Sequence, residues 1–345
     1  MQTELTQPTP LLNQVGSLNQ VGWARYPILE CNLENANFYP RWFRKLQFTR
    51  VKRWDYYAIF TPNRFFSATI ADLGYAGNVF VYTMDLETGE LHEEGLVIPL
   101  GRGISLSRDT VGVCRYRGQG VSIYFHTHPG LRSLAVDWPD FHDGRGIHAE
   151  ISLSQVHGHE SMNIVIPIPN KRFYYNHKIN CLPASGHLTY GDIQQELSPE
   201  NCLGQLDWGR GVWEYSSFWN WASASGFLPD RRTIGLNLGT GFGDTTTATE
   251  DALILDGVIH KLDRVRWEYS SGDYMQPWKF KDEAGRLDLV FTPFKDRTAA
   301  TRLLIIDSEV HQMFGRYNGI VNADDGEEIK VDGLIGFAEE HKARW

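Results

Sequence analysis

The sequence predicts an all-β protein in which two antiparallel β-barrels or sandwiches pack against each other. Three observations predict this class. Short segments rich in β-branched and aromatic residues alternate with Gly, Asp, Asn and Pro along most of the chain. No long stretch shows the apolar period of an amphipathic helix. The length of 345 residues corresponds to about two domains at roughly 150 residues each.

The first half of the chain has the pattern of a β meander and predicts an N-terminal barrel-like domain over residues 1–195. The sequence LETGEL (86–91) is typical of a turn between two of its strands. RKLQFTRV (44–51) predicts a short helix. The expected strands are 56–60, 65–73, 77–86, 120–128, 148–154 and 161–169.

A break at LSPENCLGQLDWG (197–209) precedes the second half, for which we expect a C-terminal barrel-like domain over residues 205–345. YGDIQQELS (190–198), just before it, predicts another short helix. Asp256-Gly257, between two apolar runs, predicts a tight hairpin, because both residues tolerate the positive φ of its turn. The expected strands lie within 210–224, 232–239, 251–262, 265–269, 286–294, 301–317 and 327–341.

Composition limits the classes of partner. Hydrophobic residues make up 42% of the chain and charged residues 22%, so the chain can bury a normal globular core. Its 33 basic and 42 acidic residues give a formal net charge of -9. No run of basic residues offers the stripe that a phosphate backbone needs, so nucleic acid is not expected as a partner.

The four cysteines are scattered without a C-x-x-C pair, which argues against a zinc knuckle, a redox couple or a disulfide framework. Reduced thiols fit the cytoplasm best. The N-terminus lacks the basic and apolar regions of a secretion signal. The chain contains no run of about 18 apolar residues, so no transmembrane segment is expected. We therefore expect a cytoplasmic protein.

Two histidines in SIYFHTHPGLRSLAVDW (122–138) raise the question of a metal site. His126 and His128 are two apart in a strand and share a face, and Asp137 is a possible third ligand. The pattern is distantly similar to the His-x-His-Pro signature of zinc isopeptidases. The Ser-x-x-Asp of that signature is absent, since Ser133 and Asp137 are four apart. Histidines hydrogen-bonded in a loop explain the pair better, and no metal is expected.

Three glycines follow a strand in GLNLGTGFGDTTT (235–247), namely Gly239, Gly241 and Gly243. Their spacing departs from G-x-G-x-x-G, and the Thr-rich run after them is β-prone rather than the start of a helix that holds a pyrophosphate. A bend between barrel strands explains them better, so no nucleotide or other cofactor is expected.

The segment WEYSSFWNWASASG (213–226) alternates strictly, so that Trp213, Trp219 and Trp221 share one face and Asn220 lies on the other. Three tryptophans on one face form either a bulky core, which is the commoner case, or the wall of a cavity. The Asn220 amide lies between two indoles in sequence and requires hydrogen-bond partners or a ligand.

Two strand-like segments near the C-terminus carry Glu and His at alternate positions. Glu309 and His311 share a face in IIDSEVHQMFGRY (305–317), and Glu339 and His341 share the apolar face of LIGFAEEHKARW (334–345). If both faces line one cavity, each carboxylate can orient an imidazole for proton transfer. A structural hydrogen-bond network at the end of a barrel is the alternative interpretation.

Long motifs in both halves resemble the bacterial domain-of-unknown-function family 2804 (DUF2804). The second half carries WNWASASG, GLNLGTGFGDTTTATEDALILDG, SEVHQMFGRYNG and EEHKARW, and the first half carries VGWARYPILECN, FFSATIADLGYAGNVFVYTMDLETGE and YYNHKINCLPASG. The resemblance covers nearly the whole chain and brings no assigned activity. The family's fold looks similar to the paired lipocalin-like barrels of carotenoid hydratases and tocopherol cyclases, which implies a ligand cavity in or between the barrels.

We therefore expect two lipocalin-like barrels that form a cofactor-independent lyase or isomerase of the hydratase or cyclase type. It would act on an apolar small molecule by acid–base catalysis in a β-barrel cavity of the C-terminal half. A non-catalytic carrier of a hydrophobic ligand and a glycoside-type hydrolase are the alternative hypotheses. The expected catalytic residues are Glu309, His311, Glu339 and His341, and the expected ligand-binding residues are Trp213, Trp219, Asn220, Trp221, Gln312 and Tyr317.

Overall fold

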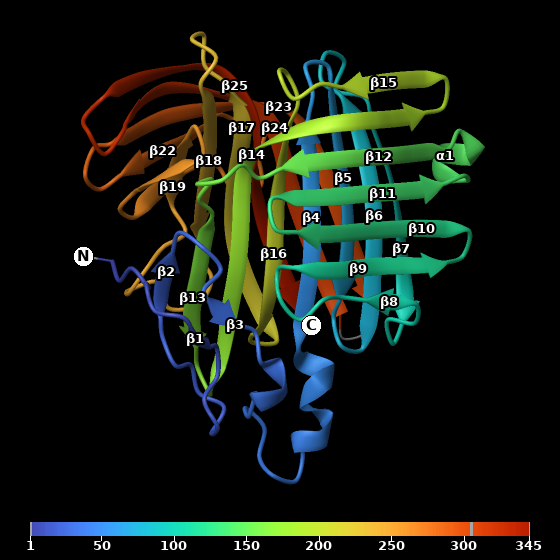
Figure 1. Ribbon diagram of the computed structural model, residues 1–345, viewed down its shortest axis with the longest axis vertical. Helices are drawn as coiled ribbons and strands as arrows, with labels where there is room; N and C mark the ends of the chain where they lie inside the picture. Colours follow the sequence, from blue (N-terminus) through green and yellow to red (C-terminus); the bar gives the residue numbers. More distant parts are fainter. Residues whose placement is uncertain (1, 304–305, 345) are drawn as a thin grey trace.

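The computed structural model describes residues 2–303 and 306–344, and it is built almost entirely of antiparallel β-strands (Figure 1). Two large curled sheets pack together, which confirms the predicted all-β class with two barrel-like halves. The described helices are short: η1 (Leu33–Asn35), η2 (Arg44–Arg50) and α1 (Phe141–Gly144). Within the part of the chain that the structure describes, no helix has the length and apolar character needed to cross a lipid bilayer.

The first sheet runs in the order β7-β6-β5-β4-β16-β14-β12-β11-β10-β9-β8, with β13 and β15 also paired to β14, and β2 paired to β13. A separate parallel pair, β1 (Thr9–Pro10) and β3 (Leu29–Glu30), lies near the N-terminus. The strands of the first sheet are β2 (Gly22–Ala24), β4 (Lys52–Phe60), β5 (Arg64–Asp72), β6 (Ala76–Asp85), β7 (Leu91–Pro99), β8 (Ile104–Ser105), β9 (Gly112–Gly118), β10 (Val121–His128), β11 (Leu131–Trp138), β12 (Ile147–Ser154), β13 (Met162–Ile168), β14 (Arg172–Tyr190), β15 (Ile193–Leu197) and β16 (Leu203–Val212).

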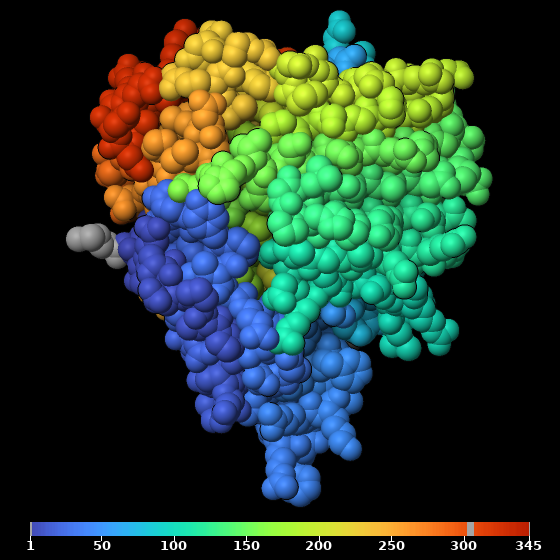
Figure 2. Space-filling model, in the orientation of Figure 1, coloured from blue at the N-terminus to red at the C-terminus, as the bar shows by residue number. Residues whose placement is uncertain are grey.

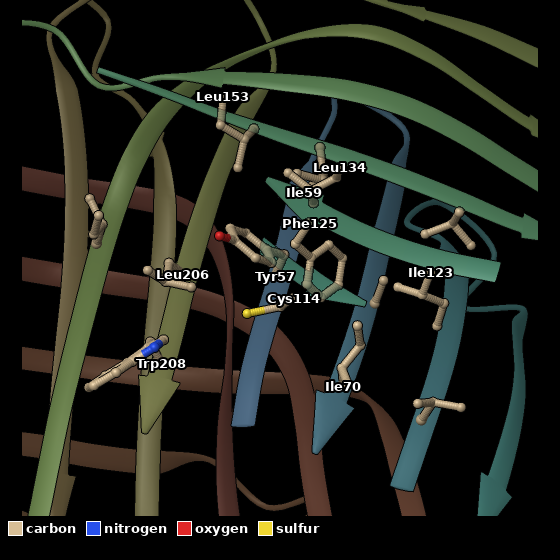
Figure 3. Close-up of a cluster of buried hydrophobic side chains, with 14 of the residues drawn as sticks. Tyr57, Ile59, Ile70, Cys114, Ile123, Phe125, Leu134, Leu153, Leu206 and Trp208 are labelled. Atoms are coloured by element: carbon tan, nitrogen blue, oxygen red, sulfur yellow. The ribbon is translucent and has the colours of Figure 1, made fainter. Parts of the chain in front are cut away.

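The long strand β14 bends where its pairing with β16 shifts register, between Ile179 and Leu182. Its first part pairs with β13 and β16, and its last part pairs with β12 and β15. The bend turns strands β9 to β12 over strands β4 to β6, and apolar side chains fill the space between the two layers (Figure 3). The interior of the first half is therefore a packed core.

The second sheet runs in the order β20-β19-β18-β17-β25-β24-β23-β22-β21. Its hairpin β19–β20 turns at Asp256-Gly257, where both residues have positive φ, as the sequence predicted. The strands are β17 (Ser216–Phe227), β18 (Thr233–Thr240), β19 (Ala252–Leu255), β20 (Val258–Lys261), β21 (Val265–Glu268), β22 (Trp278–Asp282), β23 (Leu287–Leu303), β24 (Ile306–Asn322) and β25 (Glu328–Arg344).

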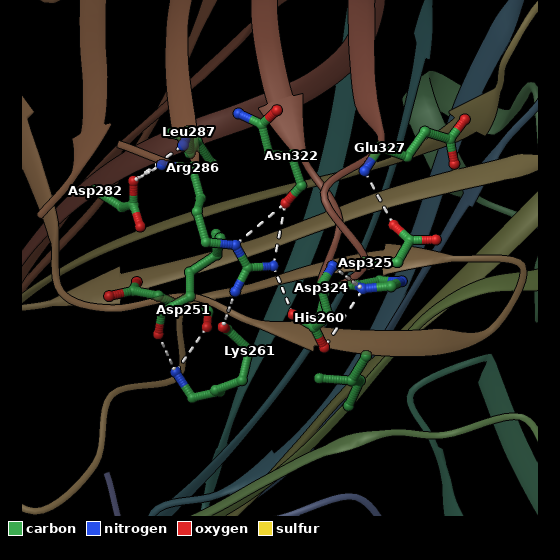
Figure 4. Close-up of polar contacts among 12 residues, drawn as sticks. Asp251, His260, Lys261, Asp282, Arg286, Leu287, Asn322, Asp324, Asp325 and Glu327 are labelled. Atoms are coloured by element: carbon green, nitrogen blue, oxygen red, sulfur yellow. Dashed lines mark hydrogen bonds and ion pairs between the residues drawn. The ribbon is translucent and has the colours of Figure 1, made fainter. Parts of the chain in front are cut away.

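Polar contacts link the two edges of the second sheet (Figure 4). The Asp251 carboxylate accepts hydrogen bonds from the backbone N–H groups of Gly239 at 2.9 Å and Val265 at 3.1 Å, so it connects β18 with β21. The Arg286 guanidinium donates to the carbonyl oxygen of Lys261 at 3.0 Å. These bonds hold the second sheet in its curled form around its own apolar core.

The two sheets meet face to face through an aromatic cluster. Tyr56, Phe65 and Tyr82 of the first sheet pack against Phe314 and Phe337 of the second. The chain passes from one sheet to the other between residues 212 and 216, so β16, which overlaps the expected break at 197–209, pairs within the first sheet.

Several sequence-based expectations differ from the observed elements. The segment expected as a helix at 190–198 contains strand β15, which pairs with β14, so that prediction was wrong, whereas 44–50 is helical as expected. Among the described strands of five or more residues, five others were not anticipated, and β16 was taken for a break. Every residue of β16 is buried, because both of its faces are covered, so it lacks the alternation that identifies a half-exposed strand. These five strands are β7, β9, β11, β14 and β22, and the short β1, β2, β3 and β8 were not anticipated either.

Candidate functional site

A cavity of about 380 Å³ lies between the two sheets. One wall comes from β4 to β7, β14 and β16 of the first sheet, and the other comes from β17 and β23 to β25 of the second. Both half-barrel interiors contain packed apolar clusters, so this space between the halves is the candidate site. Its volume fits a small organic molecule.

Aromatic side chains dominate the cavity wall. Trp54 contacts Trp213 edge to face with ring centroids 5.4 Å apart, and Tyr56 contacts Trp221 in the same way at 5.8 Å. A Cβ at position 209 would lie 2.0 Å from the Trp54 ring, so only Gly209 lets this indole lie flat on β16. The aromatic lining comprises Trp54, Tyr56, Phe80, Tyr174, Trp213, Trp219, Trp221 and Phe242.

The carboxyl group of Glu339 on β25 lies in this wall. Glu339 is buried, with 7% of its surface exposed. Its Oε2 accepts a hydrogen bond from Gln312 Nε2 at 3.0 Å, and its Oε1 accepts a longer one from Trp219 Nε1 at 3.4 Å. Burial raises the pKa of Glu339 to about 7, although the charges of Arg297 and Lys178 oppose the shift. This carboxyl group can therefore carry a transferable proton near neutral pH.

His341 lies two residues further along β25 on the same face. Its Nε2 is 2.9 Å from Ser308 Oγ, and its ring lies 4.0 Å from that of Trp219. Burial, together with the charge of Arg297, lowers the pKa of His341 to about 3. The imidazole is therefore neutral at physiological pH and can orient a water molecule by hydrogen bonding.

A buried hydrogen-bond network holds Gln312 in place. Its Oε1 accepts from the Tyr82 hydroxyl at 2.9 Å and from Arg297 Nη1 at 3.3 Å, which leaves its Nε2 to donate to Glu339. The Arg297 guanidinium in turn makes two bonds to the Glu93 carboxylate, at 2.6 and 2.8 Å. The network fixes the position of the Glu339 carboxyl group in the wall.

A second charged cluster in the cavity wall joins Lys178 of β14 and Asp207 of β16 with Glu250 from the connection between β18 and β19. Lys178 Nζ lies 2.9 Å from Glu250 Oε2 and 4.0 Å from Asp207 Oδ2. The same ammonium group lies 3.9 Å from the centroid of the Trp221 ring. Burial raises the pKa of Asp207, against the attraction of Lys178 and a hydrogen bond from Asn176. The Trp221 face therefore already contacts a positive charge inside the cavity.

The structure brings together six of the ten residues expected for the site. Figure 1 shows that the strands carrying five of them, β17, β24 and β25, are neighbours in the second sheet. Trp213 reaches the cavity from the connection that precedes β17. The six residues in the cavity wall are Trp213, Trp219, Trp221, Gln312, Glu339 and His341.

Glu309 and His311 point to the opposite face of the second sheet. In the pairing of β24 with β25, Gln312 faces Glu339 and His311 faces Glu340, so alternation separates the two Glu–His pairs. His311 Nδ1 lies 3.0 Å from Asp296 Oδ2, and its ring stacks on that of Tyr274. The two pairs do not converge in one cavity.

Asn220 and Tyr317 also lie away from the cavity. Asn220 Nδ2 donates to the Glu339 carbonyl oxygen at 3.0 Å and to the Tyr269 hydroxyl at 3.1 Å, so protein atoms satisfy the amide. The Tyr317 hydroxyl donates to the Phe337 carbonyl oxygen at 2.7 Å, and its ring is fully buried in the core of the second sheet.

Several residues of the wall were not singled out from the sequence. They come from segments far apart in the chain, and each carries a charged side chain. Lys178 in NHKINC is the clearest signal, because a lysine in the middle of a buried strand is rare and requires a partner. The charged wall residues of this kind are Glu93, Lys178, Asp207, Glu250 and Arg297.

The histidine segment 122–138 and the glycine segment 235–247 were interpreted as binding neither a metal nor a nucleotide. Both lie outside the cavity wall, except for Phe242 of the glycine segment. His126 and His128 lie on β10 with ring centroids 3.8 Å apart, on the face turned away from the core of the first half. Among residues 2–303 and 306–344, no group of three or more His, Cys, Asp or Glu side chains is arranged to hold a metal ion. Gly241 and Gly243 form a turn of positive φ after β18.

Comparison with known proteins identifies one family. No curated protein matches the sequence. Kievitone hydratase from Nectria haematococca is similar with a TM-score of 0.49 and 13% identity, covering 85% of this chain and 88% of that one. A putative AttH from Nitrosomonas europaea has a TM-score of 0.48 and 13% identity, covering 86% and 92%. The family described as domain of unknown function DUF2804 matches residues 2–345, and the chain therefore belongs to this family.

Proposed function

We propose that the cavity between the sheets binds an apolar small molecule and catalyses its hydration, cyclisation or isomerisation, with Glu339 as the general acid. One observation carries the proposal: a buried carboxyl group with a pKa of about 7 lies in an aromatic cavity of small-molecule size. No cofactor enters the reaction.

In the proposed reaction, the protonated Glu339 carboxyl group transfers its proton to a carbon–carbon double bond of the bound molecule. The Gln312 amide and the Trp219 indole donate hydrogen bonds to the two carboxyl oxygens, so they stabilise the carboxylate that remains. Burial disfavours the charged form of Glu339, whereas these hydrogen bonds favour it. Together they place the pKa of Glu339 near neutral pH.

The aromatic wall would stabilise the carbocation that protonation produces. The faces of tryptophan and tyrosine rings attract positive charge, and Trp221 already contacts the Lys178 ammonium group. In a hydration, a water molecule oriented by the neutral His341 imidazole then adds to the cation and gives up a proton to the Glu339 carboxylate. In a cyclisation, a second double bond of the same molecule attacks the cation, and the new cation that results loses a proton to the Glu339 carboxylate.

Two other functions share the cavity. A non-catalytic carrier would use the same aromatic wall and would need no titratable group. A glycoside-type hydrolase would use two carboxyl groups beside a tryptophan platform, and the negative charge of Asp207 does act on Glu339 in this cavity. The apolar lining favours an apolar molecule over a sugar.

The test begins with native mass spectrometry of freshly purified protein, followed by identification of any retained molecule. The protein is then incubated with extracts of apolar metabolites in water labelled with oxygen-18, and products are detected by mass. We expect Glu339→Gln to abolish product formation while ligand binding persists. The matched control is Glu328→Gln, an exposed carboxylate at the start of the same strand.

If the wild type and Glu339→Gln both retain an apolar ligand, and the wild type converts no component of the extracts, the carrier function is favoured. Conversion of glycosides but not of alkenes would favour the hydrolase. Equal conversion by the wild type and Glu339→Gln would remove Glu339 from the mechanism.

A further inference from the structure

A basic and aromatic segment protrudes from one end of the molecule (Figures 1 and 2). This basic tip comprises residues 41–50, most of them in η2. Four of its apolar side chains are exposed: Trp42 at 91%, Phe43 at 60%, Leu46 at 54% and Phe48 at 60%. Exposed large apolar residues that gather on one element mark an interaction surface.

The tip also concentrates positive charge. Between Glu34 and Asp55 the chain has no acidic residue, whereas the formal net charge of the whole protein is -9. The partner that fits this segment is therefore negatively charged and accepts apolar side chains. The exposed basic residues of the tip are Arg41, Arg44 and Lys45, and Arg50 is half-buried.

Specific contacts hold the tip against the turn between β5 and β6. Lys52 Nζ donates to the Leu73 carbonyl oxygen at 2.7 Å. Gly74 has a φ of +85°, and a Cβ there would lie 2.6 to 2.7 Å from backbone atoms of Phe48 and Thr49, so glycine is required for this close approach. The exposed rings thus project from a fixed support.

We propose that the basic tip docks the protein on the surface of a lipid bilayer that contains anionic lipids. Tryptophan and phenylalanine rings insert at the level of the lipid headgroups, and arginine and lysine side chains bind the lipid phosphates. A stable protein–protein interface needs roughly 800 Å² on each partner, which a narrow protrusion does not offer. A bilayer accepts such a protrusion because its headgroup region deforms around it.

The tip is joined to the cavity wall. Leu73, which accepts the Lys52 hydrogen bond, and Trp54, which follows the tip on β4, both line the cavity. Docking would therefore hold this part of the wall near the lipid surface. An apolar substrate dissolved in the bilayer would then have a short path to Glu339. This consequence rests on the proposed function, whereas the docking of the tip on a bilayer does not depend on it.

The test is vesicle flotation of the full chain without substrate. Vesicles of phosphatidylcholine with phosphatidylserine are compared with vesicles of phosphatidylcholine alone, at low and high salt. We expect binding to the anionic vesicles that weakens at high salt. Arg44→Gln with Lys45→Gln should weaken the binding by about 25-fold, because each basic residue near an anionic surface contributes about a factor of five.

The matched charge control is Arg115→Gln with Arg117→Gln, which removes two exposed arginines from the outer face of β9 and should leave binding unchanged. Trp42→Ser with Phe43→Ser should also weaken binding by about tenfold, because these rings supply apolar contact with the bilayer. Melting temperatures of all variants should match the wild type, since every substituted side chain is exposed.

Three results would overturn the proposal. One is the absence of wild-type binding to anionic vesicles. Another is equal weakening by the tip variants and the β9 variants, which would indicate a non-specific charge effect. The third is a tip-dependent self-association or single-stranded nucleic acid complex without vesicle binding, which would assign the surface to a protein or nucleic acid partner.

Discussion

Gln312 and Glu339 face each other across the paired strands β24 and β25, and Gln312 Nε2 donates to Glu339 Oε2 at 3.0 Å. The register of these two strands therefore places an amide donor on the only acid of β25 that faces the cavity among its described residues. Arg297 and Tyr82 fix the other end of the amide. The relationship predicts that Glu339 acts as the proton donor and that Gln312 positions it.

Glu339→Gln should lower turnover by roughly two to four orders of magnitude, the scale expected for loss of a general acid. Glutamine keeps the size and polarity of the side chain but has no transferable proton. The measurement is kcat for the substrate identified from the cavity, with ligand affinity determined in parallel. A fall in affinity that accounts for the whole loss of rate would contradict the role in proton transfer.

The pH dependence of stability should report the Glu339 proton. Its pKa rises from an ordinary value of 4.5 to about 7 in the folded protein. Between these values the folded state holds a proton that the unfolded state has released, so this group's stabilisation is complete below pH 4.5 and is lost as pH rises through 7. The loss amounts to about 3 kcal/mol.

Denaturant unfolding of wild type and Glu339→Gln across this pH range measures the effect. The difference between their free energies of unfolding should change in favour of the variant by about 3 kcal/mol as pH rises. Glu328→Gln, which changes an exposed carboxylate of the same strand, should show no such trend. Parallel pH curves for wild type and Glu339→Gln would show that Glu339 has an ordinary pKa.

His341 should change the stability with pH in the direction opposite to Glu339. Its pKa falls from 6.5 to about 3 in the folded protein, so the unfolded state takes up a proton that the folded state refuses. The stabilisation from this group is complete above pH 6.5 and is lost progressively as pH falls toward 3. His341→Leu should therefore lose stability less steeply than the wild type in acid, which thermal unfolding at a series of pH values will reveal.

The two Glu–His pairs should differ in their effect on turnover. His341→Ala removes a neutral imidazole from the cavity wall and should lower the rate by roughly two orders of magnitude or more. His311→Ala acts on the opposite face of the sheet, where it removes the contact with Asp296 and the stacking on Tyr274. Its main effect should be a loss of about 1 kcal/mol of stability, because the ring is partly exposed. A larger loss of turnover from His311→Ala than from His341→Ala would reverse the assignment.

Arg297 and Glu93 should behave as a buried pair. Glu93→Gln leaves the buried guanidinium without its carboxylate and should destabilise the protein by about 1 to 3 kcal/mol, since Glu93 is partly exposed. The double variant Glu93→Gln with Arg297→Met removes the unpaired charge and should recover part of this loss. Chemical denaturation compares the double variant with the two single variants. If the stability losses of Glu93→Gln and Arg297→Met add up to the loss of the double variant, the two side chains do not interact.

Alternation within single strands was readable from the sequence. The predictions that Trp219 and Trp221 share a face, and that Glu339 and His341 share the apolar face of their strand, agree with the observed pairing of β17 and β25. The hairpin at Asp256-Gly257 was likewise determined locally, by residues that tolerate positive φ. The strands β14 and β16 were missed because both of their faces are covered, which removes the period that identifies a strand.

The sequence by itself determined that the chain forms two β-sheet halves and that acid, imidazole and indole groups alternate along β17, β24 and β25. Only the tertiary structure decided which of these faces lines the cavity. Period-two alternation defines two faces of a strand but not what covers each of them. The packing of β4 to β7 against the second sheet covers the face of Glu339 and leaves Glu309 and His311 outside. Lys178, Asp207 and Arg297 join the site through contacts between strands far apart in the chain, which no local pattern records.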